Sequence, residues 1–179
     1  MDRTIELLKS AEDVLILTHK NPDGDTLGCG VALCLVLQGM GKRARVVNGD
    51  VIPKRYDYLF EGIEMPGFEP KFVVAVDVAD NKLLGDMLDA DYGDKVDLCI
   101  DHHGTNVDYA KETYVVPELP PIIIPCSACC TMLPSQKYTA ILLLLSTLSE
   151  GIAAASAIAT WFISSLSLML SSFFISALI

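Results

Sequence analysis

The sequence predicts an α/β fold: a doubly wound, mostly parallel sheet with helices on both faces, followed by an apolar C-terminal tail that is expected to be helical. Segments typical of strands alternate along the chain with segments typical of helices, which is the pattern of parallel sheets. The run from Phe72 to Val76 shows no polar alternation, as expected for a strand that is buried on both faces. With 179 residues, the chain has the length of one domain or slightly more.

Apolar runs define the expected strands, and apolar periodicity between glycines defines the helices. The strands are expected at residues 14–18, 43–48, 72–76 and 96–100, with a fifth at 114–116. Helices are expected at residues 5–10, 26–40 and 81–88, with a loop or short helix at 53–60. In the second helix, Gly28 and Gly30 allow close approach to the first strand, and Gly39 and Gly41 end the helix. Asp80 is the expected N-cap of the third helix.

The composition changes abruptly near residue 120. Residues 1–120 contain 12 of the 13 Lys and Arg and 22 of the 23 Asp and Glu, whereas residues 121–179 contain no Asp, Asn, Arg, His or Val. We therefore divide the chain into a polar domain at 1–118 and an atypical apolar tail at 119–179. Three interpretations of the tail stay open: an altered reading frame, a membrane tail and a soluble helical hairpin.

A membrane tail through residues 151–179 is allowed by length, since these 29 residues carry no charge and about 20 suffice to span a bilayer. It is not favoured, because no Lys or Arg lies near this segment and Trp161 lies inside it instead of at an edge. Residues 1–9 form a charged, amphipathic segment unlike a secretory signal. We expect a cytoplasmic protein with free thiols, because the six cysteines form no metal-binding pattern.

The formal net charge of −10 argues against a protein that coats long duplex nucleic acid through a basic face. It does not exclude a small nucleotide held through bound metal ions, because the cations invert the local charge. The loop from Thr18 to Asp25 contains one imidazole and two carboxylates directly after the first strand. His and carboxylate together suit a divalent ion of the Mn or Fe kind. The alternative interpretation is an ordinary turn with solvated acids.

Polar groups follow two further strands. Asp77 ends the third strand, and Asp101, His102 and His103 follow the fourth. A single Asp at such a place is usually a helix cap, but the carboxyl ends of parallel strands form a common ligand-binding edge. Carboxylates converging there repel one another, by about 4 kcal/mol per pair at 4 Å and a dielectric near 20. Two divalent ions would neutralise them and activate water for attack on a phosphoryl group, which indicates a dinuclear phosphoester or phosphoanhydride hydrolase.

These three motifs resemble those of the DHH phosphoesterases. The first motif is the run from His19 to Gly28, the second is Val76-Asp77, and the third is Asp101-His102-His103 followed by Gly104-Thr105-Asn106. The resemblance covers about residues 1–118 and is nearest to the branch of nano-RNases, which hydrolyse short oligoribonucleotides and 3′-phosphoadenosine 5′-phosphate. It implies a hydrolase of phosphoester bonds, either a 3′–5′ exoribonuclease or a nucleotide phosphatase, and it leaves a homodimer open.

The resemblance also implies roles for individual residues. His19 and Asp23 would hold a first manganese ion, Asp25 and His102 a second, and Asp77 would bridge the two. For catalysis, it implies that His103 lies beside the substrate phosphate and that Asp101 orients the imidazoles. It further implies that Asn21 fixes the loop or contacts phosphate.

The sequence departs from the family pattern after the third motif. The family has a fourth motif with an Asp that completes the second metal site, and a C-terminal Gly-rich loop with a His. No Asp follows Asp108, no His follows His103, and Gly151 is the only late glycine. The second metal ion therefore lacks a ligand here. Two other functions stay open: a pyrophosphatase-like hydrolase, and a truncated or frame-shifted domain without catalysis.

Overall fold

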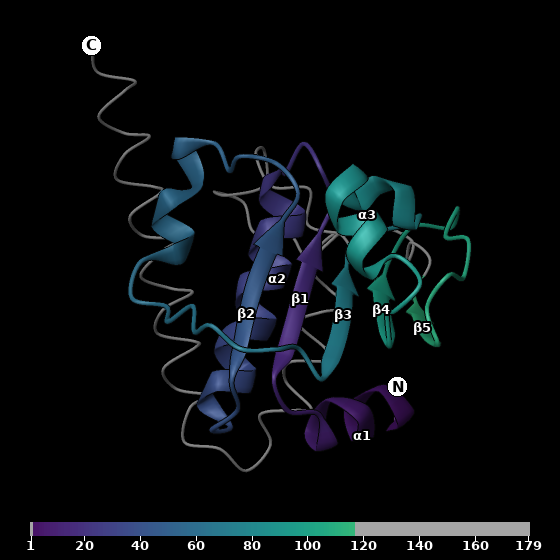
Figure 1. Ribbon diagram of the computed structural model, residues 1–179, viewed down its shortest axis with the longest axis horizontal. Coiled ribbons are helices and arrows are strands. Elements are labelled where there is room, and N and C mark those ends of the chain that lie inside the picture. Colours follow the sequence, from purple (N-terminus) through teal and green to yellow (C-terminus); the bar gives the residue numbers. More distant parts are fainter. Residues whose placement is uncertain (1, 117–179) are drawn as a thin grey trace, which may run out of the picture.

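The computed structural model describes residues 2–116, which form a five-stranded, all-parallel sheet (Figure 1). The strands are β1 (Val14–Thr18), β2 (Ala44–Asn48), β3 (Phe72–Val76), β4 (Leu98–Asp101) and β5 (Glu112–Val115). The helices are α1 (Asp2–Ser10), α2 (Gly24–Gly39) and α3 (Asp86–Tyr92), with 3₁₀ helices η1 (Lys54–Phe60) and η2 (Asn81–Leu84). The predicted tail at 119–179 lies outside the described residues.

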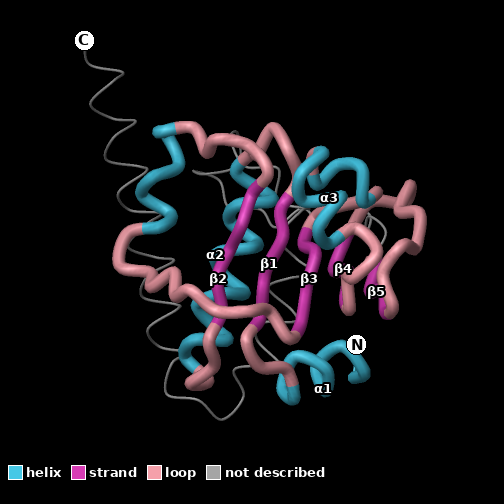
Figure 2. The backbone as a smooth tube through the Cα atoms, in the orientation of Figure 1, coloured by secondary structure: helices cyan, strands magenta, loops and turns pink. Residues whose placement is uncertain are grey.

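Helices cover both faces of the sheet, which confirms the predicted α/β class. On one face, Ile16, Val74 and Ile100 pack with Leu8 of α1 and Leu33 of α2. Figure 2 shows α2 behind the strands and α3 in front of them.

The opposite face has its own core. Leu15, Leu17 and Val73 pack there with Leu84 of η2 and Leu88 of α3. Since successive residues of a strand point to opposite faces, covering both faces requires apolar side chains at every position. This requirement explains the uninterrupted apolar runs that predicted the strands.

The strand order is β2-β1-β3-β4-β5, so the chain reverses its direction of winding between β1 and β3. The first connection leads from β1 outward to β2, and all later strands are added on the other side of β1. In open parallel sheets, ligands bind at such a switch point, outside the carboxyl ends of the two strands. His19 follows β1 and Asp77 follows β3, so both residues lie at this point.

The predicted helix at 81–88 is wrong as a single element, because the chain forms η2 and α3 in its place. Asp80 is the N-cap, as predicted, and accepts a hydrogen bond from the Lys82 amide at 3.0 Å. Gly85 then adopts φ +88°, which breaks the helical path. The Cα of Gly49 would lie 3.9 Å from a Cβ added on Gly85. The interruption thus brings the loop after β2 against the turn before α3.

Gly30 sets the distance between α2 and the sheet. A Cβ added at Gly30 would lie 2.9 Å from Thr18 Cγ2 and 3.4 Å from Val46 Cγ1, so no larger residue fits without a shift. This finding confirms the predicted close approach at Gly30. The helix ends at Gly39, as the sequence indicates, and Gly41 follows with φ +79°.

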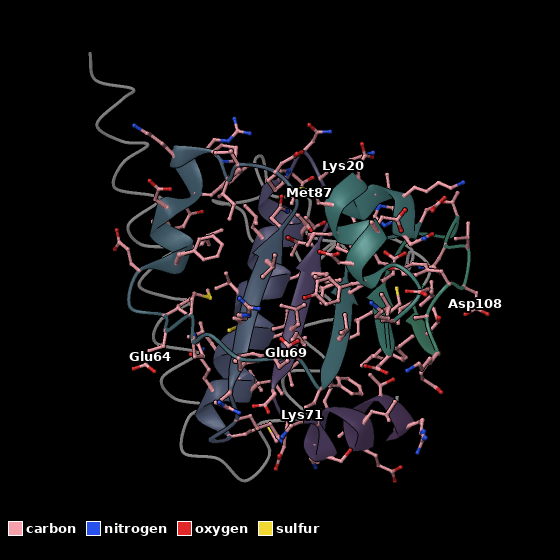
Figure 3. The ribbon with its side chains drawn as sticks, viewed as in Figure 1. Lys20, Glu64, Glu69, Lys71, Met87 and Asp108 are labelled. Carbon is pink, nitrogen blue, oxygen red and sulfur yellow. The ribbon has the colours of Figure 1, made fainter. Side chains whose placement is uncertain are left out.

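A buried carboxylate holds the opposite, amino-terminal edge of the sheet. Asp13 Oδ1 lies 2.6 Å from Arg43 Nη2, and Asp13 Oδ2 lies 3.0 Å from Lys71 Nζ. Hydrogen bonding from Lys71 lowers the pKa of Asp13 below its usual value, and Arg43 adds to this effect against the opposing effect of burial. Figure 3 places Lys71 at the other end of the molecule from Lys20, which follows β1.

None of the helices within residues 2–116 has the length and apolar character needed to cross a bilayer.

Candidate metal centre

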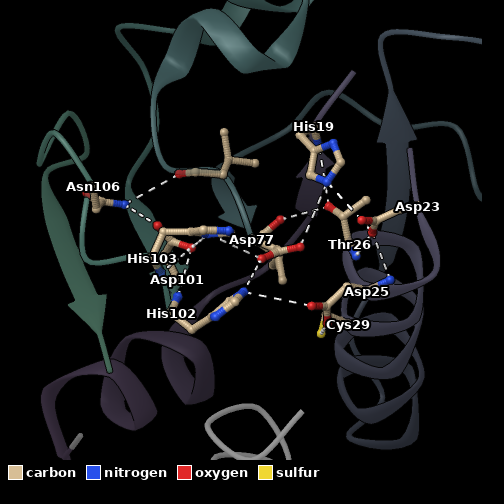
Figure 4. Close-up of polar contacts among 12 residues, drawn as sticks. His19, Asp23, Asp25, Thr26, Cys29, Asp77, Asp101, His102, His103 and Asn106 are labelled. Atoms are coloured by element: carbon tan, nitrogen blue, oxygen red, sulfur yellow. Dashed lines mark hydrogen bonds and ion pairs between the residues drawn. The ribbon is translucent and has the colours of Figure 1, made fainter. Parts of the chain in front are cut away.

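Seven of the eight predicted site residues lie together at the switch point of the sheet (Figure 4). They come from the loop after β1, the first turn of α2, and the ends of β3 and β4. They are His19, Asp23, Asp25, Asp77, Asp101, His102 and His103. Residues that are up to 84 positions apart in the sequence therefore converge, because β1, β3 and β4 end, and α2 begins, at the same edge of the sheet.

Asp77 lies at the centre of this cluster. His102 Nε2 is 2.9 Å and His103 Nδ1 is 3.6 Å from Asp77 Oδ1, while His19 Nε2 is 3.9 Å from Asp77 Oδ2. The Asp77 side chain is 5% exposed, and its backbone has φ +60°, a conformation that Asp and Asn tolerate better than most residues. The two Asp77 oxygens thus face different imidazoles, as the predicted bridging role requires.

The N-terminus of α2 fixes the second set of carboxylates. Asp23 is the N-cap, and its Oδ1 accepts hydrogen bonds from the amides of Asp25 at 2.9 Å and Thr26 at 3.2 Å. The same Oδ1 lies 3.8 Å from His19 Nε2. Asp25 is 7% exposed, and its Oδ2 lies 3.8 Å from His102 Nε2. Helix capping therefore orients Asp23 toward the cluster.

Backbone contacts orient His19. Its Nδ1 lies 2.7 Å from the carbonyl oxygen of Lys20, so Nε2 is the nitrogen that faces Asp23 and Asp77. Asn48 Nδ2 donates to the His19 carbonyl at 2.8 Å and anchors this residue to the end of β2. A fixed Nδ1 is the usual arrangement for an imidazole that binds metal through Nε2.

Asp101 is held by hydrogen bonds on both oxygens. Oδ1 accepts from the amides of His102 at 2.8 Å and His103 at 3.2 Å, and from His103 Nδ1 at 2.8 Å. Oδ2 accepts from Asn106 Nδ2 at 2.7 Å. Burial raises the pKa of Asp101, but these hydrogen bonds outweigh burial and lower it below the usual value. Asp101 is therefore an ionised carboxylate that positions the His103 ring, and its predicted part in catalysis stays a prediction.

The electrostatics of the cluster favour a bound cation. Burial raises the pKa of Asp77 to about 7, and the nearby carboxylate of Asp25 adds to this rise, while His103 and His19 oppose it. The nearby imidazoles therefore do not balance the negative charge of Asp77. A divalent cation would supply the missing positive charge.

The spacing of the donor atoms fits such an ion. Two ligands at right angles and about 2.1 Å from an octahedral ion are about 3.0 Å apart, and tetrahedral ligands about 3.4 Å. The 2.9 Å separation between His102 Nε2 and Asp77 Oδ1 is close to the octahedral value. Two groups of donors share Asp77: one has His19 and Asp23, and the other has Asp101, His102 and His103. The residues present therefore fit divalent metal ions.

Asn21 lies apart from the cluster. It has φ +53°, and its amide donates to Asp50 Oδ2 at 2.7 Å, which ties the loop after β1 to the loop after β2. With Pro22 and Asp50 it lines a separate hollow. Its predicted contact with substrate phosphate stays a prediction.

Two further residues support the site, and the sequence analysis assigned them no role. Thr26 Oγ1 donates to the Val76 carbonyl at 3.2 Å, so it links α2 to the end of β3. Asn106 holds Asp101, as described above. Both residues lie within the quoted motifs, directly after Asp25 and three positions after His103. Their place in the motifs was the available signal. The partner of Thr26 is 50 positions away in the sequence, and the contact of Asn106 with Asp101, five positions away, depends on the turn between them.

Comparison with known proteins agrees with this geometry. The model of the "DHH family, N-terminal domain" matches residues 13–160. A solved structure of an exopolyphosphatase-related protein from Bacteroides fragilis is similar over 82% of this chain, with a TM-score of 0.59 and 20% sequence identity. At that identity, the likeness establishes a common fold. This chain spans 43% of the length of that protein.

Proposed function

This chain belongs to the DHH family, and from that premise we propose that it hydrolyses short oligonucleotides or 3′-phosphoadenosine 5′-phosphate with the help of two manganese ions. The family match supports a phosphoester hydrolase, and the acid and imidazole groups form a site suited to metal ions. The observation that carries the proposal is the position of Asp77 between His19 and His102 at the switch point. The substrate assignment rests on the resemblance of the motifs to the nano-RNase branch.

The proposed ligands divide into two sets that share Asp77. His19 and Asp23 hold one ion, and Asp25 and His102 hold the other. When bound, the ions supply a hydroxide nucleophile at neutral pH and stabilise charge on the phosphoryl oxygens. The protein contributes the spacing of the donors and the burial of Asp25 and Asp77, which strengthens their electrostatic interactions.

His103 is the group that we propose contacts the scissile phosphate. Its side chain is 40% exposed, and the Asp101 carboxylate holds Nδ1 as the protonated nitrogen. Nε2 then faces away from Asp101, where the imidazolium form of His103 can donate to a phosphate oxygen or transfer a proton to the leaving group.

The test is an assay of the full chain with Mn²⁺ on a diribonucleotide and on 3′-phosphoadenosine 5′-phosphate. We expect turnover that the His102→Ala variant loses and the Lys54→Gln variant keeps, since Lys54 lies outside the cluster and is exposed. Absence of turnover above the His102→Ala background would contradict the proposal. Faster cleavage of pyrophosphate than of either nucleotide would replace it with a phosphoanhydride hydrolase.

A further inference from the structure

A hollow of about 500 Å³ lies beside the metal centre, on the side of β2. It is open to solvent, and its volume is within the range of small-molecule sites. The hollow is formed by the loops after β1 and β2 and by η1. Its lining residues are Asn21, Pro22, Asp50, Val51, Pro53 and Arg55.

A chain of hydrogen bonds connects this hollow to the metal centre. The Asn21 amide donates to Asp50 Oδ2 at 2.7 Å, and the Asp50 amide donates to Asn48 Oδ1 at 2.8 Å. Asn48 Nδ2 in turn donates to the His19 carbonyl at 2.8 Å. Asn21 and Pro22 also lie in the same loop as His19 and Asp23. A ligand in the hollow therefore lies against the outer side of the loop that carries two proposed metal ligands.

Arg55 provides positive charge in the hollow that no carboxylate of residues 2–116 neutralises through an ion pair. Its guanidinium lies 4.8 Å from the centre of the Tyr56 ring. Tyr56 in turn packs against the start of α2, where a Cβ on Gly24 would lie 3.5 Å from the tyrosine Cε1. The contact with Tyr56 holds the Arg55 guanidinium near the start of α2 and leaves its positive charge available.

Arg55 is the one cation among the residues that line the hollow, and Asp50 is the one carboxylate.

The remaining lining groups suit the rest of a nucleotide. Val51 and Pro53 offer apolar surface, and Val51 is 93% exposed. An exposed apolar side chain at the rim of a hollow is suited to the face of a nucleobase. The Asp50 carboxylate already accepts one hydrogen bond and has further acceptor capacity for a ribose hydroxyl or an exocyclic amine.

We propose that this hollow is a second subsite, in which Arg55 binds a phosphate group of the substrate other than the one that is cleaved. The proposal rests on the proposed function, because it assumes a nucleotide at the metal centre. It makes Arg55 the residue that selects substrates with two phosphate groups. Planar, bidentate hydrogen bonding is the reason that arginine suits this role.

The first experiment compares kcat/KM for one dinucleotide with and without a 5′-phosphate. We expect the wild type to prefer the phosphorylated form, and Arg55→Gln to lower that preference by about tenfold, as for one charge-assisted contact. Lys54→Gln is the matched control, since it removes the neighbouring positive charge outside the hollow, and it should keep the preference. An unchanged preference in Arg55→Gln, or an equal loss in Lys54→Gln, would overturn the proposal.

The second experiment does not depend on turnover. Amide signals of ¹⁵N-labelled protein in EDTA are followed during titration with 3′-phosphoadenosine 5′-phosphate and, separately, with adenosine 5′-monophosphate. We expect larger shifts at Asn21, Asp50 and Val51 with the bisphosphate, and their loss in Arg55→Gln. Shifts that persist in this variant would overturn the subsite. If the wild type shows these shifts without hydrolysing any substrate, the proposed function fails and the subsite stands.

Discussion

Asn106 Nδ2 donates a hydrogen bond of 2.7 Å to Asp101 Oδ2, and this contact completes the set of partners around the buried carboxylate. The other oxygen of Asp101 is occupied by His102 and His103. The Asn106 side chain is itself fixed, because its Oδ1 accepts from the Asp108 amide at 2.8 Å. A turn three residues beyond the paired histidines thus determines where the His103 ring points.

We expect Asn106→Ala to lower kcat by roughly 10- to 100-fold, the usual range for residues that orient a site through a second group. The loss should fall on kcat more than on KM, and the acid limb of the pH profile should shift to higher pH, because Asp101 loses a partner that helps to lower its pKa. Steady-state kinetics from pH 5 to pH 9 measure both effects.

The matched control is Asn81→Ala, because Asn81 Nδ2 donates to Asp89 Oδ1 at the same distance of 2.7 Å, between η2 and α3. This variant should alter stability without changing the pH profile. Asn106→Asp keeps the size of the side chain but places a second carboxylate beside Asp101, so it should not restore activity. Equal kinetic effects of the Asn81 and Asn106 changes would contradict a positioning role.

Asp77→Asn should abolish binding of Mn²⁺ and make the metal-free protein more stable than the wild type. The buried Asp77 carboxylate lies near Asp25 without a sufficient cation, and the amide removes this repulsion while accepting the same backbone conformation. In EDTA, we expect the Tm to rise by a few degrees, since about 1 kcal/mol corresponds to roughly 2–4 °C in a chain of this size.

With saturating Mn²⁺, the wild type should become more stable than Asp77→Asn. A ligand at 100 times its dissociation constant stabilises the folded state by about 2.7 kcal/mol, and only the wild type would gain it. Thermal unfolding in EDTA and in Mn²⁺, together with calorimetric titration, tests both statements. The control is Asp57→Asn, an exposed acid of η1. An equal Tm gain from Mn²⁺ in wild type and Asp77→Asn would contradict a metal centre at Asp77.

Asp13 should make stability depend on acid pH. Its pKa is lowered in the folded state by Lys71 and Arg43, so its contribution is present above the pKa of about 3.9 in the unfolded chain and is lost as the pH falls through the folded-state value. Asp13→Asn should therefore unfold more easily in urea at pH 6, and the difference should shrink as the pH falls below about 3.9.

Glu12→Gln serves as the control for Asp13, because Glu12 is adjacent, 74% exposed and only 4.0 Å from Lys71. We expect little change for this variant at either pH, as for most exposed ion pairs. A pH dependence in Asp13→Asn identical to that of the wild type would show that another group causes it.

Gly30→Ala should destabilise the fold although alanine favours helices. The added methyl group would lie 2.9 Å from the buried Thr18 Cγ2, and overpacking of this kind costs about 1–3 kcal/mol against a gain of up to about 1 from helix propensity. The control is Gly67→Ala, since nothing lies within 4 Å of a Cβ there. Thermal unfolding of both variants tests the prediction, and a higher Tm for Gly30→Ala would refute it.

Local pattern was sufficient to predict the sheet and most of the site. The apolar runs of β1 and β3 are long enough to be recognised, and the polar residues that follow them belong at the carboxyl edge of any parallel sheet. The division into η2 and α3 was missed, because a glycine within an apolar segment is compatible with a continuous helix. The positive φ of Gly85 depends on contact with the loop after β2.

The partners of Asp101 could not be predicted for a different reason. Asn106 was quoted with the third motif, but its hydrogen bond depends on the path of the backbone between residues 103 and 108. The ion pairs of Asp13 with Arg43 and Lys71 likewise join the starts of three strands. Such contacts follow from the order of strands in the sheet, which periodicity along one segment does not contain.

The left-handed backbone at Asp77 limits how this position can change during evolution. Most replacements would disturb the turn as well as the chemistry, since side chains other than Asp and Asn are unfavourable there by about 1–2 kcal/mol. Asparagine and glycine both keep the turn and remove the negative charge, and asparagine also keeps the size of the side chain. A well-folded descendant without the proposed metal chemistry is therefore a single substitution away, and such relatives should carry asparagine or glycine at this place.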